Sequence, residues 1–306
     1  MNKRPILITG SHRSGSTWMG KMIAKSKEVH YISEPFNKMH RPGICNSKFY
    51  YWFPYITKGS ESKYIKSVKD TLNFKFSFWA DLKSIKRKGH LRSLIKNYYG
   101  FSIAKIKGQR PLVKDPIAIF SAEWLADKFN SQVIVLIRHP AAFAGSLKRL
   151  NWTHPFEDFL KQPSLLKKFS NNDINKIKEY AENPPNIIYQ AILLWNLIYS
   201  TILEYKEKHK EWLFLRHEDI SREPIKYYTE IFEYLNLKFT DEIEKNILEY
   251  SNENNSKETP NGKTILKRNS KANIKNWKNR LTTEEIDKVF ENTKKIAQKF
   301  YEQQDW

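Results

Sequence analysis

The sequence has very little cysteine and no long apolar run. Cys45 is the only cysteine in 306 residues, which excludes an intramolecular disulfide framework and a metal site built from several thiolates. The apolar stretch that follows the amino-terminal Lys-Arg pair, "PILI", is too short for a secretory signal. No other window approaches the roughly 18 uncharged apolar residues that a membrane span needs. We therefore expect a soluble, cytoplasmic protein.

Acidic residues are few compared with basic ones. Lys and Arg number 53 and Asp and Glu number 33, so the formal net charge is +20. An acidic ligand, a nucleic acid or a membrane surface would suit such a charge. The lysines are, however, spread over many segments, as on an ordinary solvated surface. Because no RNA- or DNA-binding motif accompanies them, we expect no nucleic-acid partner, whereas peripheral contact with a membrane stays open.

The chain also lacks internal repeats and a clean linker, and we expect residues 1–306 to form one domain. Short apolar runs alternate with helical patterns, which predicts an α/β fold of three layers: a central, mainly parallel sheet of about five strands with helices on both faces. Two insertions, at about 36–108 and 151–186, interrupt the alternation, and the first is rich in aromatic residues. We expect strands at 5–10, 29–33, 110–115, 132–138 and 211–219, and helices at about 16–27, 119–129, 140–150, 187–209, 224–236, 240–250 and 283–303.

A glycine loop follows the first strand in "ILITGSHRSGSTW", residues 6–18, and it lacks the lysine of a nucleoside-triphosphatase loop. A strand, a glycine turn and a helix amino terminus direct several backbone N–H groups at one point, where the helix dipole also favours negative charge. We therefore predict an oxyanion cradle. Transfer of a terminal phosphate is a poor match without that lysine. Further donors to the cradle are the side chains of Arg13, Ser14, Ser16 and Thr17.

The segment "SHRSGSTWM" resembles the 5′-phosphosulfate loop of sulfotransferases that use 3′-phosphoadenosine 5′-phosphosulfate (PAPS), and is most similar to the bacterial carbohydrate type with its R-S-G-[ST]-[ST]-W pattern. The resemblance implies a P-loop-like fold and PAPS as co-substrate, released as adenosine 3′,5′-bisphosphate (PAP), with no metal. It implies that Trp18 packs near the adenine, the alternative being an ordinary core position. The residues it assigns to the 5′ end of the nucleotide are Arg13, Ser14, Gly15, Ser16 and Thr17.

Three later segments resemble other motifs of the same family. In "LIRHPAAFAGSLKRL" an Arg at a strand end precedes a Ser by eight residues, as in the 3′-phosphate motif, here Arg138 and Ser146; an Arg fork and a hydroxyl both donate well to phosphate. In "LFLRHEDISREP", Arg216 is a candidate for the nucleotide side, while Glu218 and Asp219 are expected to organise the turn. The basic loop "KRNSKANIKNWKNRLT" lacks the usual glycine, and its candidates for the 3′-phosphate are Lys267, Arg268 and Ser270.

In-line sulfuryl transfer to a hydroxyl or amine needs positioning, electrostatic support for the leaving oxygen and a base. Glu34 in "HYISEPFNK" is the candidate base, because it follows the second strand on the edge that carries the loop and because carbohydrate sulfotransferases have a similar E-P. Its pairing with a loop cation such as Arg13 is the alternative. Lys114 in "PLVKDP" is the candidate electrophilic helper. Small-molecule sulfotransferases have a catalytic histidine near this point, but here none follows, so Asp115 is the second candidate base.

The acceptor is predicted least directly. Aromatic residues such as those of "FYYWFPY" (49–55) stack on sugar rings or form the core of an insertion. Basic residues nearby would suit an acidic saccharide, and together with the resemblance they favour a sugar or glycoconjugate acceptor. A P-loop-type kinase and a non-catalytic nucleotide-binding protein are the alternatives. The basic residues are Lys38, Arg41, Lys48 and Lys58, and the histidines expected to be structural or at the surface are His40, His90, His139 and His154.

Overall fold

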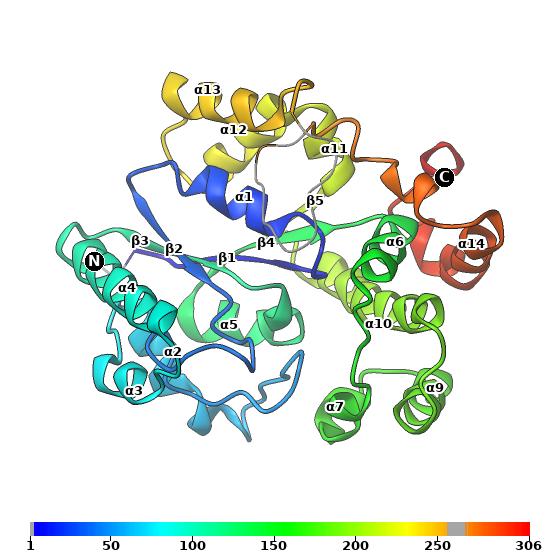
Figure 1. Ribbon diagram of the computed structural model, residues 1–306, viewed down its shortest axis with the longest axis horizontal. Coiled ribbons are helices and arrows are strands. Elements are labelled where there is room, and N and C mark those ends of the chain that lie inside the picture. Colours follow the sequence, from blue (N-terminus) through cyan, green and yellow to red (C-terminus); the bar gives the residue numbers. More distant parts are fainter. Residues whose placement is uncertain (1–2, 256–266, 268) are drawn as a thin grey trace.

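The computed structural model of this protein describes residues 3–255, 267 and 269–306. In this part of the chain the centre is a five-stranded, all-parallel sheet with the strand order β2-β3-β1-β4-β5 and helices on both faces (Figure 1). The predicted α/β architecture is confirmed. Each strand falls within its predicted segment: β1 (Ile6–Gly10), β2 (Val29–Ser33), β3 (Arg110–Lys114), β4 (Gln132–Ile137) and β5 (Leu213–Arg216).

The alternation of side chains along the strands explains why both faces of the sheet are covered. In β1, Ile6 and Ile8 belong to one hydrophobic core, whereas Leu7 belongs to the other, and β4 repeats the pattern. Successive residues of a strand point to opposite faces, so a sheet with apolar residues on both must be packed by helices on both. Strand β1 lies between β3 and β4, and the chain crosses from one side of β1 to the other when it passes from β3 to β4. This reversal of direction places a crevice at the carboxyl ends of β1, β3 and β4.

The helices that alternate with the strands match the predicted segments. Figure 1 shows α1, α12 and α13 above the sheet and α5 and α10 below it. One short helix replaces the predicted end of the last strand, because β5 stops at Arg216 and α11 begins with the acidic residues that favour a helix amino terminus. The bounds are α1 (Ser16–Ile23), α5 (Ala122–Phe129), α6 (Pro140–Leu150), α10 (Ile187–Lys208), α11 (His217–Arg222), α12 (Pro224–Tyr234), α13 (Asp241–Ser251) and α14 (Thr283–Ala297).

The two insertions contain helices of their own, for which no range was predicted. The first holds α2 (Ile65–Leu72), α3 (Phe78–Lys83) and α4 (Lys88–Ile106), and the second holds α7 (Glu157–Leu160), α8 (Pro163–Leu166) and α9 (Asn171–Glu182). Short 3₁₀ helices complete the described elements: η1 (Glu61–Lys63), η2 (Pro116–Ser121), η3 (Asn276–Asn279) and η4 (Gln303–Asp305).

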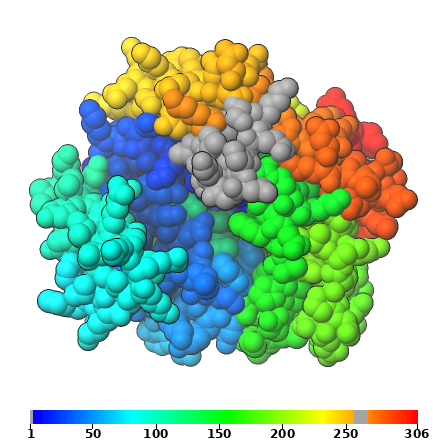
Figure 2. Space-filling view, viewed as in Figure 1, coloured from blue at the N-terminus to red at the C-terminus, as the bar shows by residue number. Residues whose placement is uncertain are grey.

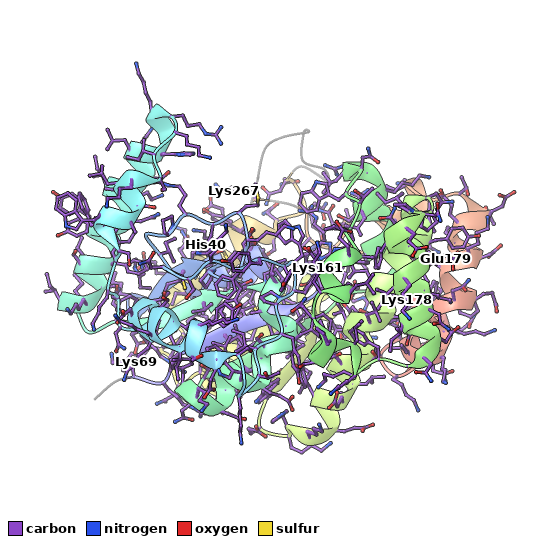
Figure 3. The ribbon with its side chains drawn as sticks, turned by 90° about the horizontal axis from the view of Figure 1, so that it is seen from below. His40, Lys69, Lys161, Lys178, Glu179 and Lys267 are labelled. Carbon is purple, nitrogen blue, oxygen red and sulfur yellow. The ribbon has the colours of Figure 1, made fainter. Side chains whose placement is uncertain are left out.

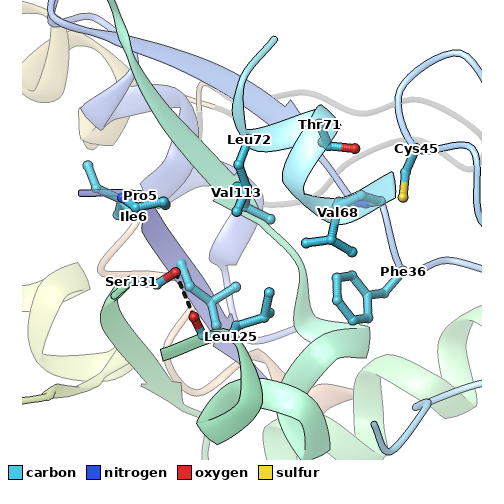
Figure 4. Close-up of a pocket in the computed structure, with 12 residues that line it drawn as sticks. Pro5, Ile6, Phe36, Cys45, Val68, Thr71, Leu72, Val113, Leu125 and Ser131 are labelled. Carbon is cyan, nitrogen blue, oxygen red and sulfur yellow. Dashed lines mark hydrogen bonds between the residues drawn. The ribbon is translucent and has the colours of Figure 1, made fainter. Parts of the chain in front are cut away.

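The first insertion packs tightly against the sheet. Phe36, Cys45 and Val68 meet Val113 of β3 and Leu125 of α5 around a cavity of only about 10 Å³ (Figure 4). A space of that size is at the lower limit for one water molecule. It is therefore a packing gap, and Cys45 is a buried core residue.

Among the described helices, only α10 is long and apolar enough to cross a membrane. No segment of this kind was expected from the sequence. However, 67% of its most apolar window is buried inside the protein. Trp195, Tyr199 and Tyr205 are fully buried along it, and the helix packs against α6 and α14. Its apolar length therefore serves the larger core.

Candidate active site

The loop between β1 and α1 requires glycine at two positions. Gly10 has a φ of 134°, and a Cβ there would stand 2.2 Å from the carbonyl oxygen of Leu136. Gly15 has a φ of 90°, and a Cβ there would stand 2.3 Å from Nδ1 of His217. Any other residue would be strained and would clash at both places. The backbone consequently turns sharply, and α1 begins at Ser16 with its amino terminus against the loop, as an oxyanion cradle requires.

A cleft of about 440 Å³, here called the basic cleft, opens beside this loop at the carboxyl edge of the sheet. Its described lining contains six Lys or Arg residues and no Asp or Glu. Burial, with Lys96 and Lys114 nearby, lowers the pKa of Lys21. A lining of one sign concentrates positive potential and suits a ligand with several phosphate or sulfate groups. The six cations are Arg13, Lys21, Lys114, Arg138, Arg149 and Arg280.

Most of the residues assigned to the nucleotide by resemblance lie on this basic cleft. Trp18 packs edge-on against Tyr228, with 5.4 Å between ring centroids, and its buried Nε1 has no hydrogen-bond partner within the described residues. Ser14 is fully buried and does not line the cleft. Ser270 does line it, with its hydroxyl donating to the Ser221 carbonyl at 3.0 Å. The others on the lining are Arg13, Gly15, Ser16, Thr17, Arg138 and Ser146.

Arg13 joins the glycine loop to the predicted 3′-phosphate motif. Its Nε donates to Oγ of Ser146 on α6 at 3.0 Å, and its guanidinium carbon lies 5.4 Å from the centroid of the Trp152 ring. Its φ of 66° is in the left-handed region, which is uncommon for a residue other than glycine and marks the tight turn of the loop. The two motifs, separated by more than 120 residues in the chain, are therefore in direct contact.

Arg138 is held in place through both its backbone and its side chain. Its N–H donates to Oη of Tyr199 at 2.6 Å, and its carbonyl accepts from Nε1 of Trp195 at 3.0 Å. Its Nε lies 3.5 Å from Oε1 of Glu218, whose other oxygen accepts from Oη of Tyr301 at 2.9 Å. Glu218 thus helps to hold the guanidinium on the lining of the basic cleft, a contact that goes beyond its expected role in the turn.

Two candidates for the nucleotide lie away from the basic cleft. Arg216 is not on its lining, because its guanidinium pairs with Asp219 at 2.6 Å and Asp305 at 3.0 Å and donates to the Phe300 carbonyl at 2.9 Å. We therefore correct its assignment to a structural one that ties β5 to the carboxyl-terminal segment. Lys267 is also off the lining and pairs with Glu249. Arg268 lies outside the described residues.

A second cleft of about 490 Å³, here called the aromatic cleft, adjoins the basic cleft and shares Arg13, Ser16 and Thr17 with it. The insertions supply its walls, with the rings of Trp52, Phe53 and Trp152 and the polar groups of Asn37, Asn151 and Thr153. Arg13 and Glu34 are the only Lys, Arg, Asp or Glu on its described lining. The aromatic cleft is thus far less charged than the basic one.

Glu34 and Lys114 form an ion pair on the border between the two clefts. The Lys114 ammonium is buried and lines the basic cleft, whereas the Glu34 carboxylate lines the aromatic cleft. Nδ2 of Asn37 also donates to Glu34, at 3.0 Å. Burial acts to raise the pKa of Glu34, but the Lys114 and Asn37 contacts outweigh it and the net pKa is lowered. Glu34 is thus paired with a cation of the third strand, Lys114.

Asp115 does not reach either cleft, so its candidacy as a second base is corrected. The side chain is fully buried and accepts from the backbone N–H groups of Phe36 at 2.7 Å and Ile117 at 3.0 Å. Burial raises its pKa to about 7. It caps the turn into η2 and holds the segment that follows Glu34. Asp115 is thus a support for the site.

Two histidines on the aromatic cleft were not expected there. His12, inside the glycine loop, was not singled out, and His154 was expected to be structural or at the surface. Burial lowers the pKa of His12 to about 4 and that of His154 to about 3, so both rings are neutral at physiological pH. Each has one buried ring nitrogen without a hydrogen-bond partner in the described structure. Its place in the glycine loop, directly before Arg13, was the only sequence signal for His12.

The chain belongs to the sulfotransferase domain family, whose model matches residues 3–302. It is similar to the sulfotransferase domain of the Synechococcus PCC 7002 olefin synthase (16% identity, 98% of this chain and 96% of that one, TM-score 0.51). Further matches are the sulfotransferase domain of the curacin biosynthetic pathway (14%, 98% and 98%, 0.49) and a mouse sulfotransferase crystallised with PAP (14%, 97% and 85%, 0.46). A search of curated proteins found no significant match.

The protein is a PAPS-dependent sulfotransferase, and the residues of the basic cleft fit that co-substrate. PAPS carries anionic groups at both ends of its ribose, and a described lining with six cations and no acidic side chain suits such a ligand. The unpartnered Trp18 Nε1 further suits a ligand lying against the loop. The described residues contain no group of three His, Cys, Asp or Glu that could hold a metal ion.

Proposed function

We propose that this sulfotransferase transfers a sulfuryl group to a hydroxyl or amine of a sugar or glycoconjugate, with Glu34 as the base. The observation that carries the proposal is the Glu34–Lys114 ion pair on the border between the basic and aromatic clefts. Bound PAPS supplies the activated sulfuryl group, whose bond to the 5′-phosphate breaks as the bond to the acceptor forms. Glu34 takes the acceptor proton, and PAP is the leaving group.

Lys114 has a role on each side of this border. An ammonium has three N–H donors, so one can stay on Glu34 while another faces the basic cleft. Toward Glu34 it fixes the carboxylate and keeps it ionised, which a base requires. Toward the basic cleft it places a buried positive charge where negative charge develops on the leaving group, and such charge is most effective in a site shielded from water.

The lining of the aromatic cleft supports a sugar as acceptor. Trp52 and Trp152 offer flat apolar faces, while Asn37, Asn151 and Thr153 offer amide and hydroxyl groups. Rings that stack and polar groups that hydrogen-bond are what a sugar, with its apolar faces and hydroxyl edges, needs.

A neutral sugar fits better than the acidic saccharide first expected. Lys38 is engaged by Asp158 at 2.9 Å and Arg41 by Asp81 at 2.7 Å, and neither lines the aromatic cleft. Lys48 and Lys58 are also absent from its lining. Since Arg13 is the one Lys or Arg on the lining that the structure describes, this lining offers little to an acidic acceptor.

The experiment that tests the proposal combines binding and transfer. Calorimetry should show tight, metal-independent binding of PAP and little binding of ATP with magnesium, whereas the reverse preference would favour a P-loop-type kinase. Transfer of sulfate label from PAPS should then be measured on neutral glycans, acidic glycans and simple phenols. Labelling of phenols alone would refute the sugar acceptor, and PAP binding without labelling of any acceptor would favour the non-catalytic alternative.

A further inference from the structure

Helices α3 and α4 carry an exposed apolar surface that faces away from both clefts. Of the twelve large hydrophobic side chains that are exposed in the described structure, eight lie on these two helices. Ile106 is 85% exposed, Trp79 72% and Tyr99 61%. A cluster of this kind on a soluble domain marks a surface that binds something. The eight residues, here called the apolar stripe, are Trp79, Leu82, Leu91, Ile95, Tyr98, Tyr99, Ile103 and Ile106.

The stripe follows the helical repeat of α4. Its six α4 members are separated by one, three or four residues, which places them along one side of the helix. The buried residues Leu94, Phe101 and Ala104 form the other apolar side and anchor α4 to the first insertion. Helix α4 thus has one apolar side for packing and another for a partner. In Figures 2 and 3 the cyan segment of α4 stands at the outer edge of the molecule, and in Figure 3 its side chains point outward.

The charges around the stripe are almost all positive. Residues 78–107 contain eight Lys or Arg and a single acidic residue, Asp81, which is buried and pairs with Arg41. On α4 itself, Arg92 and Lys96 are exposed beside the stripe. Lysine is depleted at protein–protein interfaces, whereas apolar side chains flanked by lysine and arginine are typical of helices that lie in the interface of an anionic bilayer. The composition therefore favours a lipid surface over a protein partner.

We propose that the α3–α4 surface docks the protein on membranes that contain anionic lipids. The apolar stripe enters the interfacial region, and the surrounding Lys and Arg side chains contact the lipid headgroups. The inference goes beyond the proposed function and does not depend on it.

The test is binding of the full chain to sedimented vesicles of phosphatidylcholine, with and without about a third phosphatidylglycerol. We expect binding only to the anionic vesicles, weakened as salt rises. The triple variant Ile95→Ser, Tyr99→Ser, Ile106→Ser should lose at least about tenfold in apparent affinity, because it removes three exposed apolar groups from the interface. A matched control is Leu248→Ser on α13, which is also exposed, and it should bind like the wild type.

A charge pair completes the test. Arg92→Gln with Lys96→Gln should weaken binding to anionic vesicles several-fold, whereas Lys295→Gln with Lys299→Gln, two exposed lysines at the end of α14 and just beyond it, should leave it unchanged. An unchanged melting temperature, measured by circular dichroism, shows that each variant is folded. Equal binding of wild type and stripe variant to anionic vesicles would overturn the proposal. Light scattering should also be measured on the wild type and the stripe variant. If the wild type forms a dimer and the stripe variant does not, the membrane proposal is overturned, and the partner of the stripe is a second copy of the chain.

Discussion

The basic cleft and the aromatic cleft share a loop but differ in almost everything else that lines them. The basic cleft is built from the sheet edge and the segments next to it, and its described lining carries six cations and no acid. The aromatic cleft is walled by the two insertions and carries only Arg13 and Glu34 as charged groups on its described lining, since its histidines are neutral. The fold core therefore supplies the cationic cleft that suits the nucleotide, and the insertions supply the walls of the cleft that we propose for the acceptor.

The largest effect is expected on turnover when Glu34, on the border between the two clefts, is replaced. Glu34→Gln keeps the shape of the side chain but removes the base, so turnover should fall by about 10²–10⁴-fold. PAP affinity should stay within about twofold, because Glu34 does not line the basic cleft. Steady-state rates and calorimetry on one preparation measure both. The control is Glu179→Gln on α9, an exposed residue labelled in Figure 3, and normal turnover in Glu34→Gln would move the base elsewhere.

The second effect concerns the basic cleft alone. Arg138→Ala removes a guanidinium at the mouth of this cleft, and the affinity for PAP should fall by about 10–100-fold, as expected for charged hydrogen bonds. Affinity for adenosine 5′-phosphate, which lacks the 3′-phosphate, should change much less. Arg216→Ala is the contrasting variant: it should lower the melting temperature and leave the preference for PAP over adenosine 5′-phosphate intact. Equal losses for both nucleotides in Arg138→Ala would refute the 3′-phosphate role.

Short-range patterns made much of the basic cleft predictable. The strand, the glycine turn and the helix start of the loop lie within 18 residues, and Arg138 directly follows a strand while Ser146 lies in the first two turns of the next helix. In such segments local geometry decides where a side chain points. The late loop was harder, because Lys267 and Ser270 belong to an irregular segment, and only Ser270 reaches the cleft.

The sequence could not predict the surroundings of individual charged side chains. Glu34 and Asp115 each follow a strand end on neighbouring strands, yet one carboxylate lines a cleft and the other caps a buried turn. Arg216 likewise ends a strand, but Asp219 and Asp305 engage it. The contacts that separate these cases come from residues distant in the chain. His12 and His154 meet at one cleft for the same reason, through the packing of an insertion.

A smaller effect is expected on the aromatic cleft. Trp52→Ala removes one ring face from its wall, and the KM for a sugar acceptor should rise several-fold, because a flat apolar surface for the sugar is lost. PAP affinity should not change, because Trp52 is absent from the basic cleft. Trp79→Ala, on the exposed surface of α3, is the matched control with soluble acceptors. A loss of PAP affinity in Trp52→Ala would mean that the two clefts are not independent.

The smallest effect is expected in the pH dependence of kcat/KM when the Glu34–Lys114 ion pair is broken. Contacts with Lys114 and Asn37 outweigh burial and hold the pKa of Glu34 below its ordinary value of 4.5, so kcat/KM should fall only when the pH drops through that lowered value. Lys114→Met removes the ammonium and leaves the burial, which raises a carboxyl pKa. The acidic limb should then move to higher pH by about one unit or more, while Lys114→Arg should restore most of the shift. An acidic limb that stays in place in Lys114→Met would show that Glu34 is not the group titrating, and the base would have to be sought among the other groups of the aromatic cleft.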